Sequence, residues 1–309
     1  MATKFTVGPS AGFVKTLADA ERALASGASI IVLGSYTLKE RKGNEGPRLY
    51  VGPGDHPLIL NGSLNSYGMP NLGIESLRSW LPDFVKRAND KGVKVRVSVA
   101  AFSVDEYLAC VRILSEFYDG EIEFNFGCPN VWEGSKQHRI VSFDFDVMGQ
   151  ITALARAHLG EERMVIKLSP YSDPWMFAQA WSVVMHTGVI AIVTMNTFPN
   201  AVIYDAEGKP MVDVPNGYAG YAGDAIVPIS SGQIAQFDKL RKAAQSVTTS
   251  RIVRLEGVGG VSSGAAAYQM RCSGADGVLS GTSYGQDPKV ISRIYQEMPE
   301  SLQNLAVAA

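Results

Sequence analysis

The chain has 309 residues, a length that one α/β barrel often reaches. Its 28 Lys and Arg nearly balance its 30 Asp and Glu, and the formal net charge of −2 gives no electrostatic attraction to nucleic acid or an anionic membrane. Hydrophobic residues make up 46% and charged residues 19%, which is ordinary for a globular protein with a large core. The four His are scattered, so we expect no metal site.

The three cysteines, Cys110, Cys128 and Cys272, are odd in number and widely spaced. They match neither a disulfide framework nor the spacing of a metal site. The N-terminus has no apolar signal core, and no run approaches the ~18 apolar residues of a membrane span. We therefore expect a soluble, cytoplasmic protein that binds neither a membrane nor nucleic acid.

Along the chain, short apolar runs rich in β-branched residues alternate with longer amphipathic segments. The predicted strands are Phe5–Gly8, Ser29–Leu33, Val93–Val99, Glu121–Phe126, Met164–Leu168, Ile190–Met195, Arg251–Leu255 and Gly277–Leu279. The predicted helices are Thr16–Leu24, Ile74–Lys91, Val104–Phe117, Phe143–His158, Pro174–His186, Ser231–Ala244, Ser263–Cys272 and Pro288–Glu297. Strands that are apolar on both faces and alternate with helices indicate a parallel sheet. Eight such units favour a closed (β/α)8 TIM barrel over an open, doubly wound sheet, with residues 1–309 as one domain.

Two irregular stretches, 36–73 and 197–223, are rich in Gly, Pro and Asn. Each follows a predicted strand, and long βα loops at the C-terminal face carry the chemistry of barrel enzymes. Such stretches can also be tolerated surface insertions. Their many uncharged hydrogen-bonding side chains favour a functional role.

The last two predicted strands lead into glycine-rich turns. Gly259 and Gly260 precede a predicted helix, and Gly281 and Thr282 follow the eighth strand. Glycines expose backbone N–H groups, and a helix N-terminus attracts an anion. Glycine pairs also serve ordinary tight turns, but the loops after strands seven and eight of this fold commonly bind phosphate. The pattern predicts a cofactor or substrate that carries phosphate.

The segment FNFGCPN, residues 124–130, closes a strand and places Cys128 at the barrel mouth. A thiol there can act as a base or nucleophile if it has thiolate character. An isolated Cys is more often a small buried hydrophobic residue. We assign Cys110 and Cys272, which lie in helical apolar patterns, to packing.

Other polar residues also end strands or lie in the irregular loops. Lys167 ends a strand, and a buried Lys is costly unless it faces an anionic or electron-rich partner. An Asn alone is more often a turn residue. Four amides at one face, however, could read a planar, amide-containing ring through donors and acceptors. These amides are Asn65, Asn125, Asn130 and Asn196.

Nearly the whole chain resembles the dihydroorotate dehydrogenases, in particular the soluble, Cys-using (class 1A-like) branch. The shared strings are SYTLKERKGN, SLNSYGMPNLG, NFGCPN, IKLSPYSD, MNT followed by PNAV, GYAGYAGDAIVP, GVGGV and a late GT. NFGCPN and NSYGMPNLG are highly specific as a pair. Membrane-associated relatives carry Ser in place of Cys128 and have an N-terminal extension.

The resemblance implies an oxidoreductase that uses flavin mononucleotide (FMN), acts on a CH–CH bond and oxidises dihydroorotate to orotate. Cys128 is the implied catalytic base, and Lys167 is the implied cation beside flavin N1 and O2, while hydride passes to flavin N5. The implied substrate-binding residues are Asn65, Tyr67, Gly68, Met69, Asn125, Asn130, Asn196 and Thr197, with backbone N–H groups of residues 67–69 holding the substrate carboxylate. The implied cofactor contacts are Ala11, Gly12, Ser35, Asn125, Lys167, Met195 and Gly223, with Gly259, Gly260, Gly281 and Thr282 at the phosphate. The family further implies a homodimer and a soluble electron acceptor such as fumarate.

This chain departs from the family at Gly34, where the family has a Lys that touches the substrate carboxylate and the flavin. Ala11 replaces a Ser at the flavin, Tyr67 replaces an aliphatic residue and Thr197 replaces a Ser. Losing a charge-assisted bond costs ~1.5–3 kcal/mol. A second hypothesis therefore keeps the flavin and Cys128 but changes the substrate to another cyclic or amide-bearing molecule. A third is a flavin- or phosphate-ligand-binding protein without catalysis, and a fourth is a barrel enzyme without flavin.

Overall fold

Eight parallel strands form the centre of the computed structural model, which describes residues 5–52, 62–133, 136–160, 162–212, 214, 217–246 and 252–299. In the order in which they are hydrogen-bonded, the strands are β1 (Thr6–Pro9), β14 (Gly277–Ser280), β13 (Arg254–Val258), β10 (Ala191–Val193), β9 (Met164–Lys167), β6 (Glu121–Asn125), β5 (Lys94–Val99) and β2 (Ile30–Tyr36). At the seam, the Ser29 N–H donates to the Val7 carbonyl at 3.0 Å, which brings β2 against β1. The predicted (β/α)8 barrel is confirmed.

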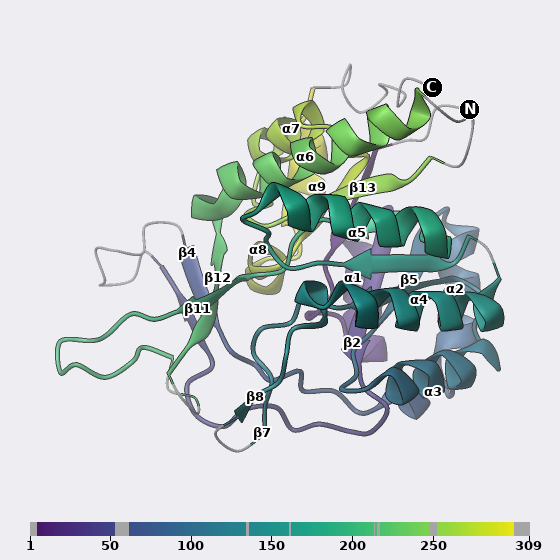
Figure 1. Cartoon of the computed structure of the whole chain (residues 1–309). Helices are drawn as coiled ribbons and strands as arrows, with labels where there is room; N and C mark the ends of the chain where they lie inside the picture. Colours follow the sequence, from purple (N-terminus) through teal and green to yellow (C-terminus); the bar gives the residue numbers. More distant parts are fainter. Residues whose placement is uncertain are drawn as a thin grey trace.

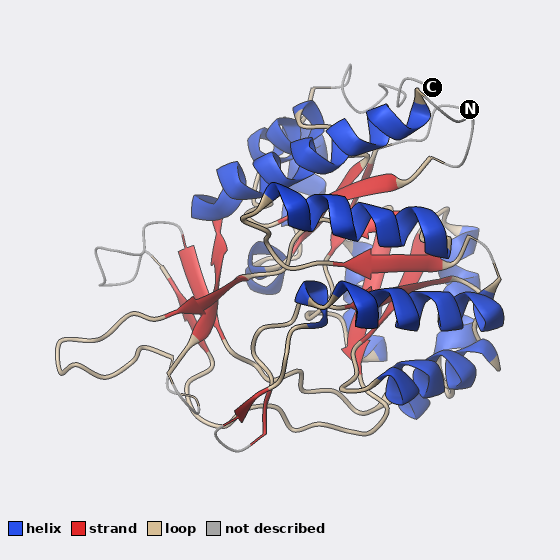
Figure 2. Ribbon diagram, in the orientation of Figure 1, coloured by secondary structure: helices blue, strands red, loops and turns tan. Residues whose placement is uncertain are grey.

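Helices surround this sheet, as Figures 1 and 2 show. They are α1 (Leu17–Ala25), α2 (Leu81–Asp90), α3 (Val104–Ser115), α4 (Phe145–Leu159), α5 (Pro174–Thr187), α6 (Val227–Gln245), α7 (Gly264–Cys272), α8 (Thr282–Gln286) and α9 (Val290–Glu297). Short 3₁₀ helices lie at η1 (Ile74–Leu77), η2 (Val141–Phe143) and η3 (Asp224–Ile226). No helix among the described residues is long and apolar enough to cross a membrane.

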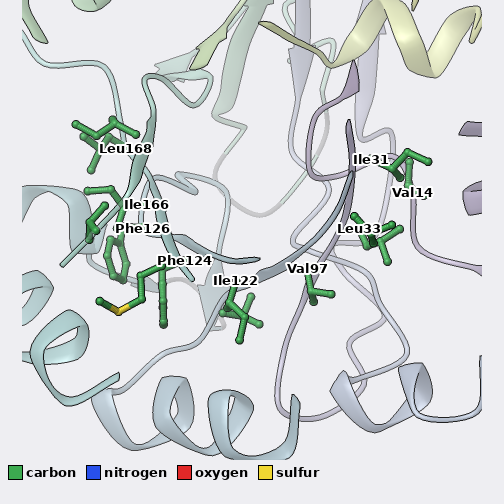
Figure 3. Close-up of a cluster of buried hydrophobic side chains, with 14 of the residues drawn as sticks. Val14, Ile31, Leu33, Val97, Ile122, Phe124, Phe126, Ile166 and Leu168 are labelled. Carbon is green, nitrogen blue, oxygen red and sulfur yellow. The ribbon is translucent and has the colours of Figure 1, made fainter. Parts of the chain in front are cut away.

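The main core lies between the barrel and its helices. Along β6, Ile122 and Phe124 point outward and are fully buried in this layer, with Ile166 of β9 beside them (Figure 3). The alternate residues Glu121 and Glu123 belong to the other face of the strand, because successive side chains of a strand point to opposite sides. The alternation of side chains along β6 thus places apolar residues in the outer core and charged residues in the barrel interior.

A second sheet covers the C-terminal end of the barrel and is built from the two irregular stretches. Its strands, in spatial order, are β11 (Phe198–Ala201), β12 (Ala219–Gly223), β4 (Gly62–Asn65) and β3 (Leu49–Val51). The antiparallel pairing of β12 with β4 joins segments about 155 residues apart, for example Gly220 opposite Asn65. A further hairpin pairs β7 (Trp132–Glu133) with β8 (Lys136–Gln137). The sequence predicts long loops at this face but no sheet within them.

Among the predicted elements whose bounds differ from the observed ones, two are instructive. The seventh strand was expected at Arg251–Leu255 and runs from Arg254 to Val258, while Arg251 lies outside the described residues. The predicted helix Ile74–Lys91 is split into η1 and α2. Pro82 is the second residue of α2, where its missing N–H costs no hydrogen bond, so the helix starts there.

Candidate active site

One cavity opens at the C-terminal end of the barrel, beneath the second sheet. With the solvent space at its mouth it encloses about 1070 Å³. Every residue that the sequence predicted for catalysis, substrate or cofactor lines it. It is also lined by Ser10, Phe13, Lys15, Leu49, Ala222, Ile226, Val258, Val261 and Ser283. The barrel therefore brings the predicted residues together around one cavity.

Cys128 lies in the loop after β6 and is half-buried. It packs beside Met69, Ala100 and Val131, so its sulfur lies between an apolar cluster and the cavity. Gly127 allows this turn, because a Cβ there would come within 2.5 Å of the Leu168 carbonyl oxygen. Cys110 is buried in α3, which confirms its assignment to packing, whereas Cys272 is exposed, so its assignment to packing was wrong; neither lines the cavity.

The charge around Cys128 partly offsets the cost of its burial. Burial raises the pKa of the thiol, whereas the Asn130 N–H and the positive charges of Lys167, Lys15 and Arg41 favour the thiolate. A group that must lose its proton to act as a base is thus surrounded by donors and cations. This arrangement can hold a thiolate once a proton has left.

Lys167 ends β9 and brings an ammonium group into the cavity while remaining only 5% exposed. Its ammonium makes no hydrogen bond or ion pair within the described part of the chain. Burial lowers the pKa of Lys167, while Glu123 and Cys128 oppose that change. Glu123 lies in the barrel interior, and burial raises its pKa against the influence of Lys167 and Arg96. A buried cation without a direct partner is costly, so an electron-rich ligand would stabilise it.

The four predicted amides form two hydrogen-bonded groups at the cavity wall. Asn130 Nδ2 donates to the backbone oxygen of Asn65 at 2.8 Å and to its Oδ1 at 3.2 Å. Asn196 Nδ2 donates to Asn125 Oδ1 at 3.1 Å. The Thr197 hydroxyl is buried and has no hydrogen-bond partner among the described residues. Several polar atoms therefore remain available to a planar polar ligand.

The position of Gly34 is closed to a side chain. Its φ is +96°, and a Cβ would lie 2.6 Å from the Ser98 carbonyl oxygen and 2.8 Å from the Tyr36 nitrogen. The Gly34 N–H donates to the Val14 carbonyl at 2.8 Å, so the next residue along the chain, Lys15, lies close by. The family that this chain resembles has a lysine at the position of Gly34. In this chain, Lys15 places a positive charge close to that position, on the adjoining segment.

Lys15, which is not among the residues predicted from the sequence, brings a positive charge into the cavity. Its Nζ donates to the Pro70 carbonyl at 2.7 Å, and its backbone N–H is held by Asp19 Oδ2 at 3.0 Å. Burial lowers its pKa to about 8, while Cys128 and Asp19 oppose the change. The signal was available: like Cys128, Lys15 closely follows a predicted barrel strand, and it directly precedes the N-cap of α1, Thr16.

The loop after β4 adds backbone donors next to Lys15. Gly68 and Met69 have left-handed backbones, with φ of +69° and +57°, and both line the cavity. Their carbonyl oxygens accept from Arg41 Nε at 3.3 Å and Asn71 Nδ2 at 2.9 Å, respectively. Their N–H groups donate to no described residue. Two N–H donors beside an ammonium make a site suited to a carboxylate.

The opposite end of the cavity is made by the turns after β13 and β14. Gly259 and Gly260 have φ of +108° and +83°, values that glycine adopts at little cost. Ser263 caps the N-terminus of α7, and Thr282 begins α8 beside Gly281. The predicted phosphate residues thus lie together, at turns whose N–H groups and helix termini favour an anion.

Comparison with known proteins agrees with this geometry. A family model described as dihydroorotate dehydrogenase matches residues 3–302. The chain is 28% identical over 278 residues to a putative dihydroorotate dehydrogenase A (fumarate) of Streptococcus uberis, covering 89% of this chain and 82% of that protein. It is 28% identical over 286 residues to the dihydroorotate dehydrogenase (fumarate) of Saccharomyces cerevisiae, covering 90% and 83%. A probable dihydroorotate dehydrogenase A (fumarate) of Enterococcus faecalis is 26% identical over 289 residues, covering 92% and 86%.

Proposed function

Because the chain belongs to the dihydroorotate dehydrogenase family, we propose that it oxidises dihydroorotate to orotate with FMN as cofactor. The observation that carries this proposal is that Cys128, Lys167 and the four amides all line one cavity. A proton-accepting thiol, a buried cation and ring-reading amides are the groups that such an oxidation needs in one place.

The donor set of the cavity fits FMN. The Lys167 ammonium has no direct partner among the described residues, and the glycine-rich turns at the far end suit a phosphate. The residues that would hold the ring are Ala11, Gly12, Ser35, Asn125, Lys167, Met195 and Gly223. The residues that would hold the phosphate are Gly259, Gly260, Gly281 and Thr282. Once bound, the flavin supplies the acceptor for the hydride that leaves one substrate carbon.

Cys128 takes the proton from the other reacting carbon, the one next to a ring carbonyl, and a carbon–carbon double bond forms between the two. The charges of Lys15, Lys167 and Arg41 favour the thiolate that this step consumes. The proton then leaves the thiol for solvent, which restores the base. The partly apolar surroundings of Cys128 limit the water that competes for the thiolate.

Lys15 and the N–H groups of Gly68 and Met69 form the proposed site for the substrate carboxylate. The second hypothesis, a different cyclic or amide-bearing substrate, depended on the absence of a cation at Gly34. Lys15 supplies a cation within the same cavity, which removes the reason for preferring that hypothesis.

The proposal is tested by the visible spectrum of the purified protein, followed by anaerobic titration with dihydroorotate. We expect a yellow protein that is bleached as orotate forms in equal amount. A colourless protein would contradict the flavin, and a yellow one that saturating dihydroorotate leaves oxidised would contradict the substrate. Bleaching would also exclude a binding protein without catalysis.

For the remaining partners we propose fumarate as electron acceptor, since the relatives above carry that name. Reoxidation of the bleached protein by fumarate under argon tests this. We also propose a homodimer in the cytoplasm, with one barrel domain per chain. The three cysteines are free in the structure, which agrees with a reducing compartment.

A further inference from the structure

Two of the cavity amides are hydrogen-bonded into a chain that leads away from the cavity, into the barrel interior. Asn196 Nδ2 donates to Asn125 Oδ1 at 3.1 Å, and Asn125 Nδ2 donates to Ser35 Oγ at 2.8 Å. Ser35 Oγ lies 2.9 Å from Ser98 Oγ, which in turn donates to Glu123 Oε1 at 3.0 Å. Ser98 and Glu123 are fully buried and do not line the cavity.

The two ends of this chain fix its direction. At one end, the Thr197 N–H, which can only donate, donates to Asn196 Oδ1 at 2.8 Å. At the other end, the carboxylate of Glu123 accepts. Because Ser98 spends its single proton on Glu123, Ser35 must donate to Ser98, and the amide of Asn125 must therefore donate to Ser35. Every link runs the same way, and aligned links of this kind strengthen one another.

This direction determines what the two amides have left to offer. Each amide oxygen, on Asn125 and Asn196, already accepts one hydrogen bond within the chain. Each amide nitrogen has used one proton and retains one. An unpaired N–H is costly when buried, whereas a carbonyl oxygen with one partner is largely satisfied. The wall therefore requires acceptor atoms from its ligand.

We infer that Ser98 and Glu123 are positioning residues, which act through Ser35 to hold Asn125 and Asn196 as N–H donors toward the carbonyl oxygens of the substrate ring. The inference rests on the proposed function, because orotate and dihydroorotate supply those carbonyl oxygens. It extends the specificity of the site to residues in the barrel interior, which no substrate atom reaches.

The first variant is Glu123→Gln, which keeps the shape of the side chain. Arg96 Nη1 lies 3.6 Å from Glu123 Oε2, so the new amide is expected to turn its oxygen toward the guanidinium and its nitrogen toward Ser98. Ser98 Oγ would then accept a hydrogen bond from the new amide instead of donating one to a carboxylate. Its own proton would point to Ser35. Ser35 would then accept from both Ser98 and Asn125 and would turn its own proton away from the chain, so the links would no longer be aligned. We expect orotate to bind roughly five- to tenfold more weakly, as for a hydrogen bond lost.

The second variant, Ser98→Ala, breaks the same chain without changing any charge near Lys167. It should weaken orotate binding by a similar factor. Glu256→Gln is the matched control, because it removes another carboxylate from Arg96 that is not part of the chain. Thr152→Val is a second control, since it removes a buried hydroxyl on α4 that bonds only to its own helix. Both controls should bind orotate as the unaltered protein does.

The measurement is the dissociation constant of the holoprotein for orotate and for two analogues, each lacking one ring carbonyl oxygen. The unaltered protein should bind at least one of the two analogues more weakly than it binds orotate. In Ser98→Ala and Glu123→Gln, the difference in affinity between orotate and that analogue should be smaller. A merely structural role of Ser98 and Glu123 would not produce this change. Equal affinities and equal differences in all variants would overturn the inference.

If Ser98→Ala does not fold, the Glu123→Gln result decides alone. If the unaltered protein fails to bind orotate, the proposed function fails instead, so the two failures are distinguishable.

Discussion

At the scale of single residues, Cys128 decides whether the cavity is catalytic. Cys128→Ala should keep the yellow cofactor, because the ring and phosphate contacts are unchanged. Dehydrogenation should fall by roughly 10²–10⁴-fold, the usual contribution of a general base. Rapid-mixing measurement of flavin reduction by dihydroorotate checks this, with Cys272→Ala, an exposed cysteine, as control. Normal turnover in Cys128→Ala would refute the assignment.

Lys15 should make ligand binding depend on pH. Burial lowers its pKa to about 8, so the ammonium is charged below that pH and neutral above it. The affinity for orotate should therefore be constant at lower pH and fall about tenfold per unit above pH 8. Calorimetric titration between pH 6.5 and about 10 measures this. Lys15→Met should bind orotate roughly 10- to 100-fold more weakly at pH 7 and lose the pH dependence. A pH dependence that persists in Lys15→Met would assign it to another group.

Lys167 should act on the cofactor rather than on the substrate. Lys167→Met keeps most of the apolar stem and removes the charge. The midpoint potential of the bound flavin should fall, and its reduction by dihydroorotate should slow by roughly ten- to a hundredfold. Redox titration and the reductive half-reaction measure the two effects. An unchanged potential and half-reaction would contradict the placement of the ammonium beside the flavin.

At the scale of elements, β12 makes a steric contact that holds the substrate wall in place. A Cβ on Gly220 would lie 2.0 Å from Thr197 Oγ1 and 3.2 Å from Asn130 Nδ2. Gly220→Ala should therefore displace both side chains and lower kcat/KM by roughly ten- to a hundredfold. Gly232→Ala, at an exposed and open position of α6, is the control and should gain up to about 1 kcal/mol of stability. Equal kinetics in the two variants would show that the β12 contact does not position the wall.

The predicted site residues come from segments whose positions follow from the barrel itself. A residue that follows a barrel strand lies at the C-terminal mouth, so Cys128, Lys167 and Asn196 could be placed from the order of the elements alone. Lys15 follows the same rule, but its role becomes apparent only beside Gly34 of β2. Its proximity to Gly34 depends on the contact between Val14 and Gly34, a pairing that no local pattern reveals.

At the scale of the whole molecule, a buried cluster of charged side chains links several strands within the barrel. Arg96 is 0% exposed and contacts Glu121 at 2.6 Å and Glu256 at 2.5 Å, from strands on different sides of the barrel. Arg96→Met should cost about 3–5 kcal/mol of unfolding free energy, since it leaves buried carboxylates unpaired. Urea denaturation measures this. Arg254→Met, which removes a more exposed partner of Glu121, should cost about 1 kcal/mol. Equal losses would argue against a special role for burial.

The same cluster predicts the stability of the protein in acid. Burial opposes ionisation of Glu121, but Arg96 and Arg254 hold its pKa down to about 2. A carboxyl whose folded pKa is depressed stabilises the protein above its unfolded pKa of 4.5 and loses that contribution as pH falls toward 2. Thermal unfolding between pH 5 and about 2.5 should show this decline, and in Arg96→Met it should be smaller. An equal decline in that variant would assign it to other carboxyls.

The barrel was predictable because each of its strands carries a local apolar pattern, whereas the second sheet was not. Its strands are short and rich in Gly and Asn, and the pairing of β12 with β4 joins residues such as Tyr221 and Leu64 that are far apart in sequence. The end of β13 was misplaced for a related reason. Glu256 reads as the end of an apolar strand, but Arg96, 160 positions away, neutralises it and lets the strand continue.

The pairing of β12 with β4 also has a consequence for how a substrate enters. One strand belongs to the connection after β2 and the other to the connection after β10, and four residue pairs tie them together. Neither connection can swing aside while the other stays in place, so any widening of the cavity mouth at this wall moves the two strands together. Changes remote from the chemistry, on the outer strands β3 and β11, should then alter the rate of product departure without altering the chemistry itself.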